Sequence, residues 1–264
     1  MKIPFFFLII QYRLFRFVSP VFIFLSAVIF SAPACKIPFT ILSVIPHKEP
    51  AFTQGLSYHR NVLYESSGLY GKSAVKIINP SNGVILRIHN FPSDLFAEGI
   101  AVYKNIIYCL TWKNGRLLTF DLESLAPGGE YRYQGEGWGL AFDGTNFIRS
   151  SGESLLFYHR ADDFKLLRKI SVTLDGAPLQ KINELEYVKG KVYANVWMKN
   201  FIAVIEPDGT VSGIIDFSIP AIRHRGNDPD NVLNGIAWDA KNDVFYITGK
   251  NWPLIYRVNL DISD

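Results

Sequence analysis

The chain alternates between short apolar runs and turn residues along most of its length. The runs are rich in β-branched and aromatic residues, a composition typical of strands. They read NVLYESS, AVKIINP, NIIYCLTW, RLLTFDL, KVYANVW, IAVIEP, DVFYITG and LIYRVNL. The segments between them, such as NPSNG, KNG, PGG and EPDG, contain the residues that tight turns need. No long stretch after the first 34 residues has helical periodicity, so the pattern predicts an all-β protein.

A recurring motif divides these strands into five units. It reads QGLSY at Gln54, EGIAV at Glu98, WGLAF at Trp138, ELEYV at Glu184 and NGIAW at Asn234, at intervals of 40 to 50 residues. Such a period, with about four strands per unit, indicates a five-bladed β-propeller. The last unit lacks a fourth strand. We expect the apolar residues 37–46 to supply it, so that an N-terminal strand closes the last blade and removes two unpaired sheet edges. A β-sandwich with a satellite domain is the competing architecture.

Propeller geometry brings equivalent positions of the units together. The first strand of each blade lines a central channel, so the openings of the five units are expected to converge at one face of the ring. These openings are Gln54, Glu98, Trp138, Asn183 with Glu184, and Asn234, and the ends of the second strands add Glu65, Trp112, Trp197 and Lys250. The set is a candidate pocket. Each member also has a structural interpretation, because tryptophans serve blade packing and single polar residues serve surfaces and turns.

The first 34 residues differ from the rest of the chain. They contain no acidic residue and a long apolar run that ends in Ala32-Pro33-Ala34, an order typical of a cleavable signal peptide. The alternative is an uncleaved membrane anchor, for which residues 17–34 are close to the lower length limit. Lipid attachment at Cys35 is disfavoured, because Ala32 stands where a bulky aliphatic residue is expected. Residues 35–264 are then the propeller domain, exported to the periplasm or secreted, or attached to a membrane through residues 1–34.

Removing this segment changes the charge of the protein. The whole chain has 27 basic and 24 acidic residues, and the segment holds three of the basic ones, Lys2, Arg13 and Arg16, which leaves 24 of each. The remaining basic residues are scattered and form no phosphate-binding stripe. We therefore expect no nucleic-acid partner, and we expect a monomer.

Metal and cofactor chemistry have no support in the sequence. The five histidines show no HxH or HExxH spacing. There is no GxSxG nucleophile motif and no glycine-rich nucleotide loop before a helix. Cys109 lies in an apolar strand pattern and is expected to be a small buried residue, while a bridge to Cys35 stays open. We expect no metal and no cofactor, so an enzyme of this sequence would work with carboxylate, amide, indole and lysine groups.

Nine ordered sequence blocks resemble a known family. They read PHKEPAFTQGL, ESSGLYGKS, FAEGI, LTWKNG, GEGWGL, NELE, GKVYANVW, NVLNGIAWD and TGKNWP, and extend from Pro46 to about Leu260. Together they resemble the plant and bacterial type of glutaminyl-peptide cyclotransferase. The resemblance implies a five-bladed propeller and an acyltransferase activity that needs no metal. That activity converts the N-terminal glutamine of peptides and proteins to pyroglutamate and releases ammonia.

The resemblance also implies roles for individual residues. The acid of FAEGI, Glu98, corresponds to the proton shuttle of the family. The substrate-binding positions fall on Gln54, Trp112, Trp138, Asn183, Trp197 and Lys250. Three residues depart from the family pattern: Ala97 replaces a glycine beside the acid, and Ser151 and Arg160 replace turn residues. We expect the turn changes to be structural, and we expect the Ala97 methyl group to alter backbone freedom beside Glu98.

A single carboxylate suits this reaction. The α-amine of the substrate, with a free pKa of about 7.7–8.0, attacks the γ-carboxamide of the same residue, so the enzyme mainly has to fold the substrate. Glu98 would accept the amine proton and return it to the departing NH₂, which requires a raised pKa in an aromatic pocket. Indole N–H groups, the Asn183 amide and Lys250 are candidate donors to the oxyanion.

Two other functions fit a propeller of this composition. A non-catalytic envelope propeller that binds peptides or proteins would use the same aromatic ring without a proton shuttle. A lactonase-like hydrolase would need a calcium site, for which Glu98, Asn183 and Asn234 are the candidates.

Overall fold

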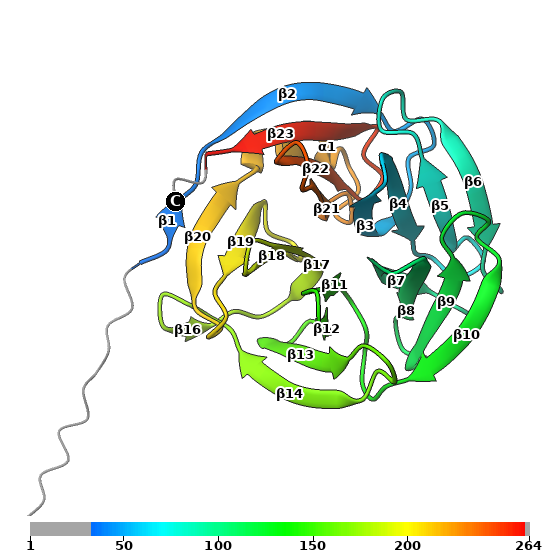
Figure 1. Ribbon diagram of the computed structural model, residues 1–264. Helices are drawn as coiled ribbons and strands as arrows, with labels where there is room; N and C mark the ends of the chain where they lie inside the picture. The colour runs from blue at the N-terminus through cyan, green and yellow to red at the C-terminus, as the bar shows by residue number, and fades with distance from the viewer. Residues whose placement is uncertain (1–32, 262–264) are drawn as a thin grey trace, which may run out of the picture. The chain divides into compact units, whose positions relative to one another are not determined.

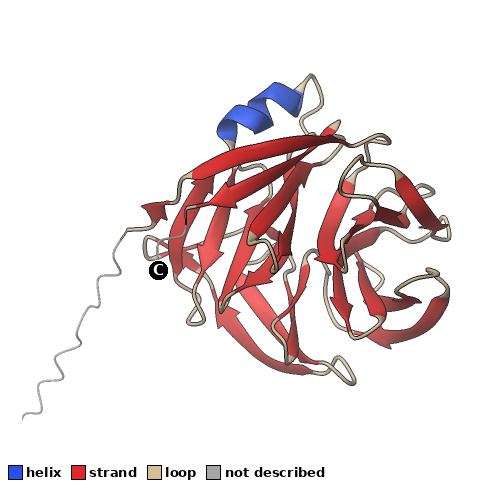
Figure 2. Ribbon diagram, turned by 45° about the horizontal axis from the view of Figure 1, so that its top comes forward, coloured by secondary structure: helices blue, strands red, loops and turns tan. Residues whose placement is uncertain are grey.

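The computed structural model describes residues 33–261. The predicted signal peptide or anchor therefore lies outside the described residues, except for its last two positions. The strands form five antiparallel blades around a central axis, which Figure 1 shows nearly end-on and Figure 2 from a tilted direction. The predicted all-β fold and its five blades are confirmed.

Each blade contains four strands, which lie side by side in order from the central axis to the rim. The inner strands are β3 (Thr53–His59), β7 (Ala97–Tyr103), β11 (Leu140–Phe142), β17 (Ile182–Val188) and β21 (Leu233–Asp239). The second strands are β4 (Val62–Ser67), β8 (Ile106–Thr111), β12 (Asn146–Arg149), β18 (Lys191–Val196) and β22 (Val244–Gly249). The third strands are β5 (Ala74–Ile78), β9 (Arg116–Asp121), β13 (Leu155–Arg160), β19 (Phe201–Ile205) and β23 (Leu254–Leu260). The outer strands are β6 (Ile85–Asn90), β10 (Pro127–Arg132), β14 (Leu166–Ser171), β20 (Val211–Asp216) and β2 (Phe39–Pro46).

The outer strand of the fifth blade comes from the N-terminal part of the described chain. β2 pairs with β23 in antiparallel register, from Phe39 opposite Leu260 to Pro46 opposite Leu254. The predicted closing strand is therefore confirmed. The preceding strand β1 (Cys35–Lys36) pairs in parallel with β20 of the fourth blade. One continuous segment thus binds two neighbouring blades and closes the ring (Figure 1).

The core lies between the blades. In β8, Ile107 and Cys109 belong to the apolar cluster shared with the first blade, whereas Tyr108 and Leu110 belong to the cluster shared with the third. Alternate side chains of a strand point to opposite faces, so a strand buried on both faces needs an uninterrupted apolar run. The described residues form one such cluster at each of the five blade interfaces. The prediction that Cys109 is buried is confirmed, and neither it nor the exposed Cys35 forms a disulfide.

Glycines let the inner strands approach one another closely. A Cβ atom at Gly99 would lie 2.4 Å from the backbone nitrogen of Leu140, and one at Gly139 would lie 2.0 Å from the carbonyl oxygen of Asn183. Both distances are far shorter than van der Waals contact, so no other residue fits at these positions. The repeated glycine of the motif therefore narrows the channel and brings the residues that precede it to one mouth of the ring.

The fourth blade has a glutamate in place of this glycine. The carboxylate of Glu184 is fully buried and accepts hydrogen bonds from the backbone N–H groups of Leu56 at 3.3 Å and Ile236 at 2.9 Å. These donors belong to the inner strands of the first and fifth blades. Burial and the nearby Glu186 raise the pKa of Glu184 well above its ordinary value, against the effect of the two N–H donors. Glu184 thus fills the channel and links three blades.

Besides β1, a hairpin and a helix have no counterpart in the repeat. A two-stranded hairpin, β15 (Thr173–Leu174) and β16 (Ala177–Pro178), precedes β17, and an eight-residue helix, α1 (Ser218–Arg225), lies between β20 and β21. Three basic residues in the last turn of α1 face the negative end of its dipole. Within residues 33–261, no helix has the length and apolar character that crossing a membrane requires.

Candidate active site

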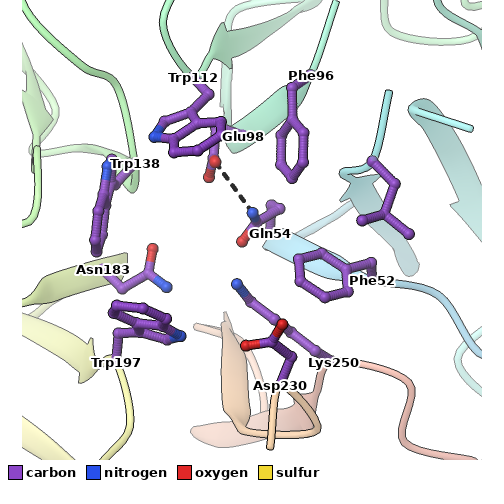
Figure 3. Close-up of a pocket in the computed structure, with 11 residues that line it drawn as sticks. Phe52, Gln54, Phe96, Glu98, Trp112, Trp138, Asn183, Trp197, Asp230 and Lys250 are labelled. Carbon is purple, nitrogen blue, oxygen red and sulfur yellow. Dashed lines mark hydrogen bonds between the residues drawn. The ribbon is translucent and has the colours of Figure 1, made fainter. Parts of the chain in front are cut away.

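A pocket of about 330 Å³ opens at the mouth of the channel where the inner strands begin. Figure 3 shows three tryptophans along one side, two phenylalanines along the other, and polar groups that point between them. The pocket is lined by Phe52, Gln54, Leu69, Phe96, Glu98, Trp112, Trp138, Asn183, Trp197, Asp230 and Lys250. All seven residues predicted for the site, taken from five different blades, are therefore brought together.

The pocket side chains predicted from the sequence stand at two backbone positions of the repeat. The first is the start of the inner strand, which carries Glu98 in the second blade. The second is the residue that follows the second strand, which is Trp112 in that blade. The N–H of Trp112 donates to the carbonyl of Phe96 at 3.0 Å, and the N–H of Lys250 donates to the carbonyl of Val232 at 2.9 Å. The same hydrogen bond in different blades fixes the two positions side by side.

Aromatic rings form the pocket walls. The rings of Trp138 and Trp197 meet edge to face, with centroids 5.9 Å apart. On the other side, Phe96 lies 5.4 Å from Trp112 and 6.2 Å from Phe52, measured between centroids. Such offset and edge-to-face contacts are the favourable geometries for aromatic pairs. The walls are therefore rigid and apolar, which suits the exclusion of water from a reacting group.

Glu98 is the carboxylate at the base of this pocket. Only 4% of its surface is exposed, and its Oε1 accepts a hydrogen bond of 3.0 Å from the Gln54 amide nitrogen. Burial raises the pKa of Glu98 well above its ordinary value, because a charged carboxylate loses hydration there. The Lys250 cation opposes this rise and the Glu136 carboxylate adds to it. Gln54 therefore orients Glu98, and the pocket favours the protonated acid.

Lys250 and Asn183 carry unsatisfied polar groups into the same space. The ammonium group of Lys250 lies 4.4 Å from the centroid of the Phe52 ring, and burial lowers its pKa, an effect that Glu98 opposes. Among residues 33–261, Lys250 forms no ion pair within 4.0 Å. The buried side-chain oxygen of Asn183 likewise has no hydrogen-bond partner in the described chain. Buried polar groups are normally paired, so both groups are available to a ligand.

The indole N–H groups of two tryptophans are not available to a ligand. Trp112 Nε1 donates at 2.8 Å and Trp138 Nε1 at 2.9 Å to Oε2 of Glu136, which lies outside the pocket. Of the candidate oxyanion donors, these two indole N–H groups are therefore already bonded to Glu136. Their faces line the pocket, while their N–H groups are held by an acid behind it.

Sequence reasoning missed four pocket residues: Phe52, Leu69, Phe96 and Asp230. A signal existed for two of them, since Phe52 and Phe96 each stand two positions before a predicted residue. In a strand, residues two apart face the same side. Asp230 follows α1 in a segment outside the repeat, and no sequence pattern marks it.

Three residues considered for the pocket lie elsewhere. The carboxylate of Glu184 points into the channel, and Asn234 is fully buried and donates at 2.8 Å to the carbonyl of Thr53. Glu65 lies inside β4 rather than at its end. The residue after β4 is Gly68, where a Cβ atom would lie 2.2 Å from the Phe96 ring. The first blade thus leaves space for Phe96 instead of contributing a side chain.

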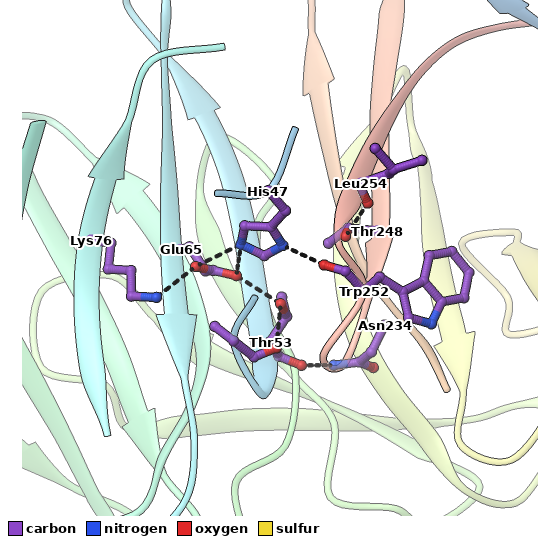
Figure 4. Close-up of polar contacts among 9 residues, drawn as sticks. His47, Thr53, Glu65, Lys76, Asn234, Thr248, Trp252 and Leu254 are labelled. Carbon is purple, nitrogen blue, oxygen red and sulfur yellow. Dashed lines mark hydrogen bonds and ion pairs between the residues drawn. The ribbon is translucent and has the colours of Figure 1, made fainter. Parts of the chain in front are cut away.

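Glu65 belongs instead to a buried polar cluster at the closure of the ring (Figure 4). Its carboxylate accepts from the Thr53 hydroxyl at 2.7 Å and lies 3.1 Å from His47 Nε2 and 3.6 Å from Lys76 Nζ. Burial alone would raise the pKa of Glu65, but the neighbouring His47 and Lys76 outweigh it and lower the pKa to about 2. For His47, burial is likewise outweighed by the carboxylate, which raises the pKa.

The departure at Ala97 is accommodated. Ala97 is fully buried, and its backbone does not adopt a positive φ angle that would require glycine. Its N–H donates to the Ser73 hydroxyl at 3.1 Å. The expectation that the methyl group alters the backbone beside Glu98 finds no support in this geometry.

The pocket combines an acid with a raised pKa, an unpaired ammonium and an unpaired amide. Among residues 33–261, no three His, Cys, Asp or Glu side chains converge as they would in a metal site. These three groups, the acid, the ammonium and the amide, are suited to moving one proton and to stabilising one developing negative charge.

Comparisons with known proteins assign the family. A sequence model of the family described as glutamine cyclotransferase matches residues 23–260. The glutaminyl-peptide cyclotransferase of Arabidopsis thaliana is 36% identical over 228 residues, which are 83% of this chain and 70% of that protein. The crystal structure of Myxococcus xanthus glutaminyl cyclase matches with a TM-score of 0.81 and 34% identity, and the match covers 88% of this chain and 100% of that one. The protein is thus an enzyme, and the chain belongs to the glutamine cyclotransferase family.

Proposed function

We propose that the protein is a glutaminyl-peptide cyclotransferase, which converts the N-terminal glutamine of peptides and proteins to pyroglutamate and releases ammonia. The observation that carries the proposal is the buried Glu98, held by Gln54 in an aromatic pocket that also presents the Lys250 ammonium. A volume of about 330 Å³ is small for a ligand site and suits one residue. Membership of the family supports the same activity.

In the proposed reaction Glu98 moves a single proton. The neutral α-amine attacks the γ-carboxamide carbon, and the C–N bond that forms closes a five-membered ring. The carboxylate of Glu98 takes the proton that the amine loses and returns it to the amide nitrogen, so that the C–N bond to the leaving group breaks with departure of NH₃. Because burial raises the pKa of Glu98 above its ordinary value, the side chain holds the transferred proton more readily than a solvent-exposed carboxylate would.

Lys250 and Asn183 complete the proposed site. The Lys250 ammonium is placed to stabilise the negative charge that develops on the carboxamide oxygen, and its poor hydration strengthens that interaction. The unpaired oxygen of Asn183 is an acceptor for N–H groups of the substrate. The tryptophan faces confine the glutamine side chain so that amine and carboxamide meet. The proposed steps use no metal.

The test measures ammonia release from a glutaminyl dipeptide amide by the native protein and the Glu98→Gln variant. The variant keeps the shape of the side chain but cannot carry the proton, so we expect turnover to fall by about a hundredfold or more. Glu123→Gln, the same change at an exposed carboxylate of the second blade, is the control and should leave turnover unchanged. A chelator should have no effect.

Each contrary result points to a different error. A folded Glu98→Gln variant with near-native turnover would remove the proton-shuttle role. Loss of native activity on chelation would indicate a calcium-dependent hydrolase instead. Absence of any ammonia release, with retained binding of glutaminyl peptides, would indicate a non-catalytic peptide-binding propeller.

We also propose that the domain formed by residues 35–264 acts as an exported monomer, released by cleavage after Ala34 or attached to a membrane through residues 1–34. The apolar run that ends in Ala32-Pro33-Ala34 supports this proposal. The intact mass of the protein recovered from cells distinguishes the two fates. A mass that includes residues 1–34 in a soluble cytoplasmic fraction would contradict both.

A further inference from the structure

We propose that Glu136 is a positioning residue of the active site, whose carboxylate fixes the indole rings of Trp112 and Trp138 as walls of the glutamine pocket. The proposal rests on the proposed function for its kinetic consequences and on contacts outside the pocket for its geometry. Glu136 does not line the pocket and touches no atom that would react.

One carboxylate oxygen joins two walls that come from different blades. Oε2 of Glu136 accepts from Trp112 Nε1 at 2.8 Å and from Trp138 Nε1 at 2.9 Å. Trp112 follows β8 of the second blade, whereas Trp138 precedes β11 of the third. A tryptophan at a pocket rim can turn about two side-chain bonds, and a charged acceptor on its N–H restricts that rotation. The shared oxygen therefore sets the angle between the two rings.

The segment that carries Glu136 is itself held in place. The guanidinium of Arg149, which is 2% exposed, donates to the backbone carbonyls of Glu136 and Gln134. It lies 4.8 Å from the Tyr133 ring centroid and 4.3 Å from that of Phe157. Because this buried guanidinium donates to backbone carbonyl groups rather than to a carboxylate, it fixes the backbone of the segment. The loop before Trp138 is thus anchored on the third blade.

His159 completes the support of Arg149. Its Nδ1 faces the Phe164 carbonyl at 2.9 Å, which requires a proton on Nδ1 and leaves Nε2 free to accept from Arg149 Nε at 3.3 Å. Burial lowers the pKa of His159 to about 4, so the ring is neutral near pH 7 and can accept this bond. The chain of contacts therefore runs from His159 through Arg149 and Glu136 to the two pocket walls.

The same carboxylate affects Glu98 through space. Its negative charge adds to the burial that raises the pKa of Glu98. The other charged or titratable groups around Glu98 are Lys250 and Asp230 in the pocket, and Tyr133 and Cys109 beside it. The groove behind the indoles adds Arg149, Glu153 and Lys169 around Glu136. Geometry and charge can be separated, because a glutamine at position 136 keeps an oxygen that accepts hydrogen bonds and loses only the charge.

The test compares Glu136→Ala, Glu136→Gln and native protein in ammonia release from a glutaminyl dipeptide amide and in tryptophan fluorescence. For Glu136→Ala we expect a higher KM, a fall in kcat/KM of about tenfold to a hundredfold, and easier quenching of emission by acrylamide. For Glu136→Gln we expect the same acrylamide quenching of tryptophan emission as in the native protein, and a KM close to the native value. The acid limb of its pH profile of kcat/KM should lie at lower pH than that of the native protein. Glu153→Gln removes a charge from the same groove without touching an indole, and should change none of these.

Several results would overturn the proposal. Native quenching and native KM in a folded Glu136→Ala variant would show that the carboxylate does not position the walls. Equal losses in Glu136→Ala and Glu136→Gln would show that the retained acceptor has no effect. If Glu153→Gln shows the same changes, they result from the loss of any negative charge in this groove and not from the loss of the contacts between Glu136 and the indoles. If the native protein releases no ammonia, the proposed function fails, while the quenching comparison still decides whether Glu136 holds the indoles.

Discussion

The buried acid at the closure of the ring gives the sharpest stability prediction. Glu65 comes from β4 of the first blade, whereas His47 directly follows β2 of the fifth. His47 Nδ1 also faces the carbonyl of Trp252 at 3.1 Å, within the loop before β23. The Glu65 carboxylate therefore connects the closing strand to the first blade. Replacing it by glutamine removes the charge and leaves His47 and Lys76 buried without a counter-ion.

The magnitude follows from the pKa of Glu65. A pKa lowered from 4.5 to about 2 means that folding favours the ionised form by about 3 kcal/mol. Loss of one partner from a buried ion pair costs a similar amount, about 3 to 5 kcal/mol. We therefore expect Glu65→Gln to lower the free energy of unfolding by about 3 kcal/mol at pH 7.

The pH dependence has a definite sign. Because the pKa of Glu65 is lower in the folded state, its contribution is present above about pH 4.5 and is lost as the pH falls towards 2. The pKa of His47 is raised, so its contribution is present below its ordinary value of 6.5 and is lost as the pH rises through the higher folded value. The difference in the free energy of unfolding between the native protein and Glu65→Gln should thus become smaller as the pH falls below 4.5.

The assay is urea unfolding, followed by circular dichroism, of native protein and Glu65→Gln between pH 7 and pH 2.5. Glu123→Gln serves as the control, since it removes an exposed carboxylate and should stay within about 0.5 kcal/mol of the native protein. A Glu65→Gln variant within 1 kcal/mol of native at pH 7, or a difference that persists unchanged to pH 2.5, would refute the reasoning.

Two further substitutions test other parts of the structure. Lys250→Met removes both the proposed oxyanion donor and the cation that opposes the raised pKa of Glu98. Turnover should fall by about 10²- to 10³-fold and the acid limb of kcat/KM should move to higher pH, whereas an unmoved limb would contradict the coupling. Glu184→Ala leaves the N–H groups of Leu56 and Ile236 without acceptors. Thermal and urea unfolding should show a loss of about 2 kcal/mol or more, and unchanged stability would mean that water replaces the carboxylate.

Most of the fold can be predicted from the sequence, because each blade repeats the same local pattern of residues. The motif residue, the glycine after it and the next apolar runs recur in four of five units, and the glycine has a steric cause at Gly99 and Gly139. The fourth unit was aligned on Glu184, one position too far, because glutamate replaces the glycine that marks the register elsewhere. Helix α1 was not anticipated, since eight residues without a strong apolar stripe give little periodic signal.

The site was readable only where it follows the repeat. Glu98 and Asn183 open inner strands and Lys250 follows a second strand, so equivalence alone brings them together. Asp230 belongs to an insertion, and the position of an insertion depends on tertiary packing. The indole contacts of Glu136 were also out of reach, because a sequence shows which residues converge but not where their donors point.

The closure of the ring also bears on catalysis, because Glu98 and Lys250, the two ionisable groups of the proposed reaction, come from non-adjacent blades. Glu98 belongs to the second blade and Lys250 to the fifth, and the first blade lies between them. Their separation is therefore set by how the fifth blade docks on the first, which is the interface that β2, His47 and Glu65 secure. In an open stack of blades, small rotations at each interface would add up between the two groups. Closing the ring removes that freedom, so that five blades with different side chains at equivalent positions hold the Glu98 carboxyl group and the Lys250 ammonium at a fixed distance.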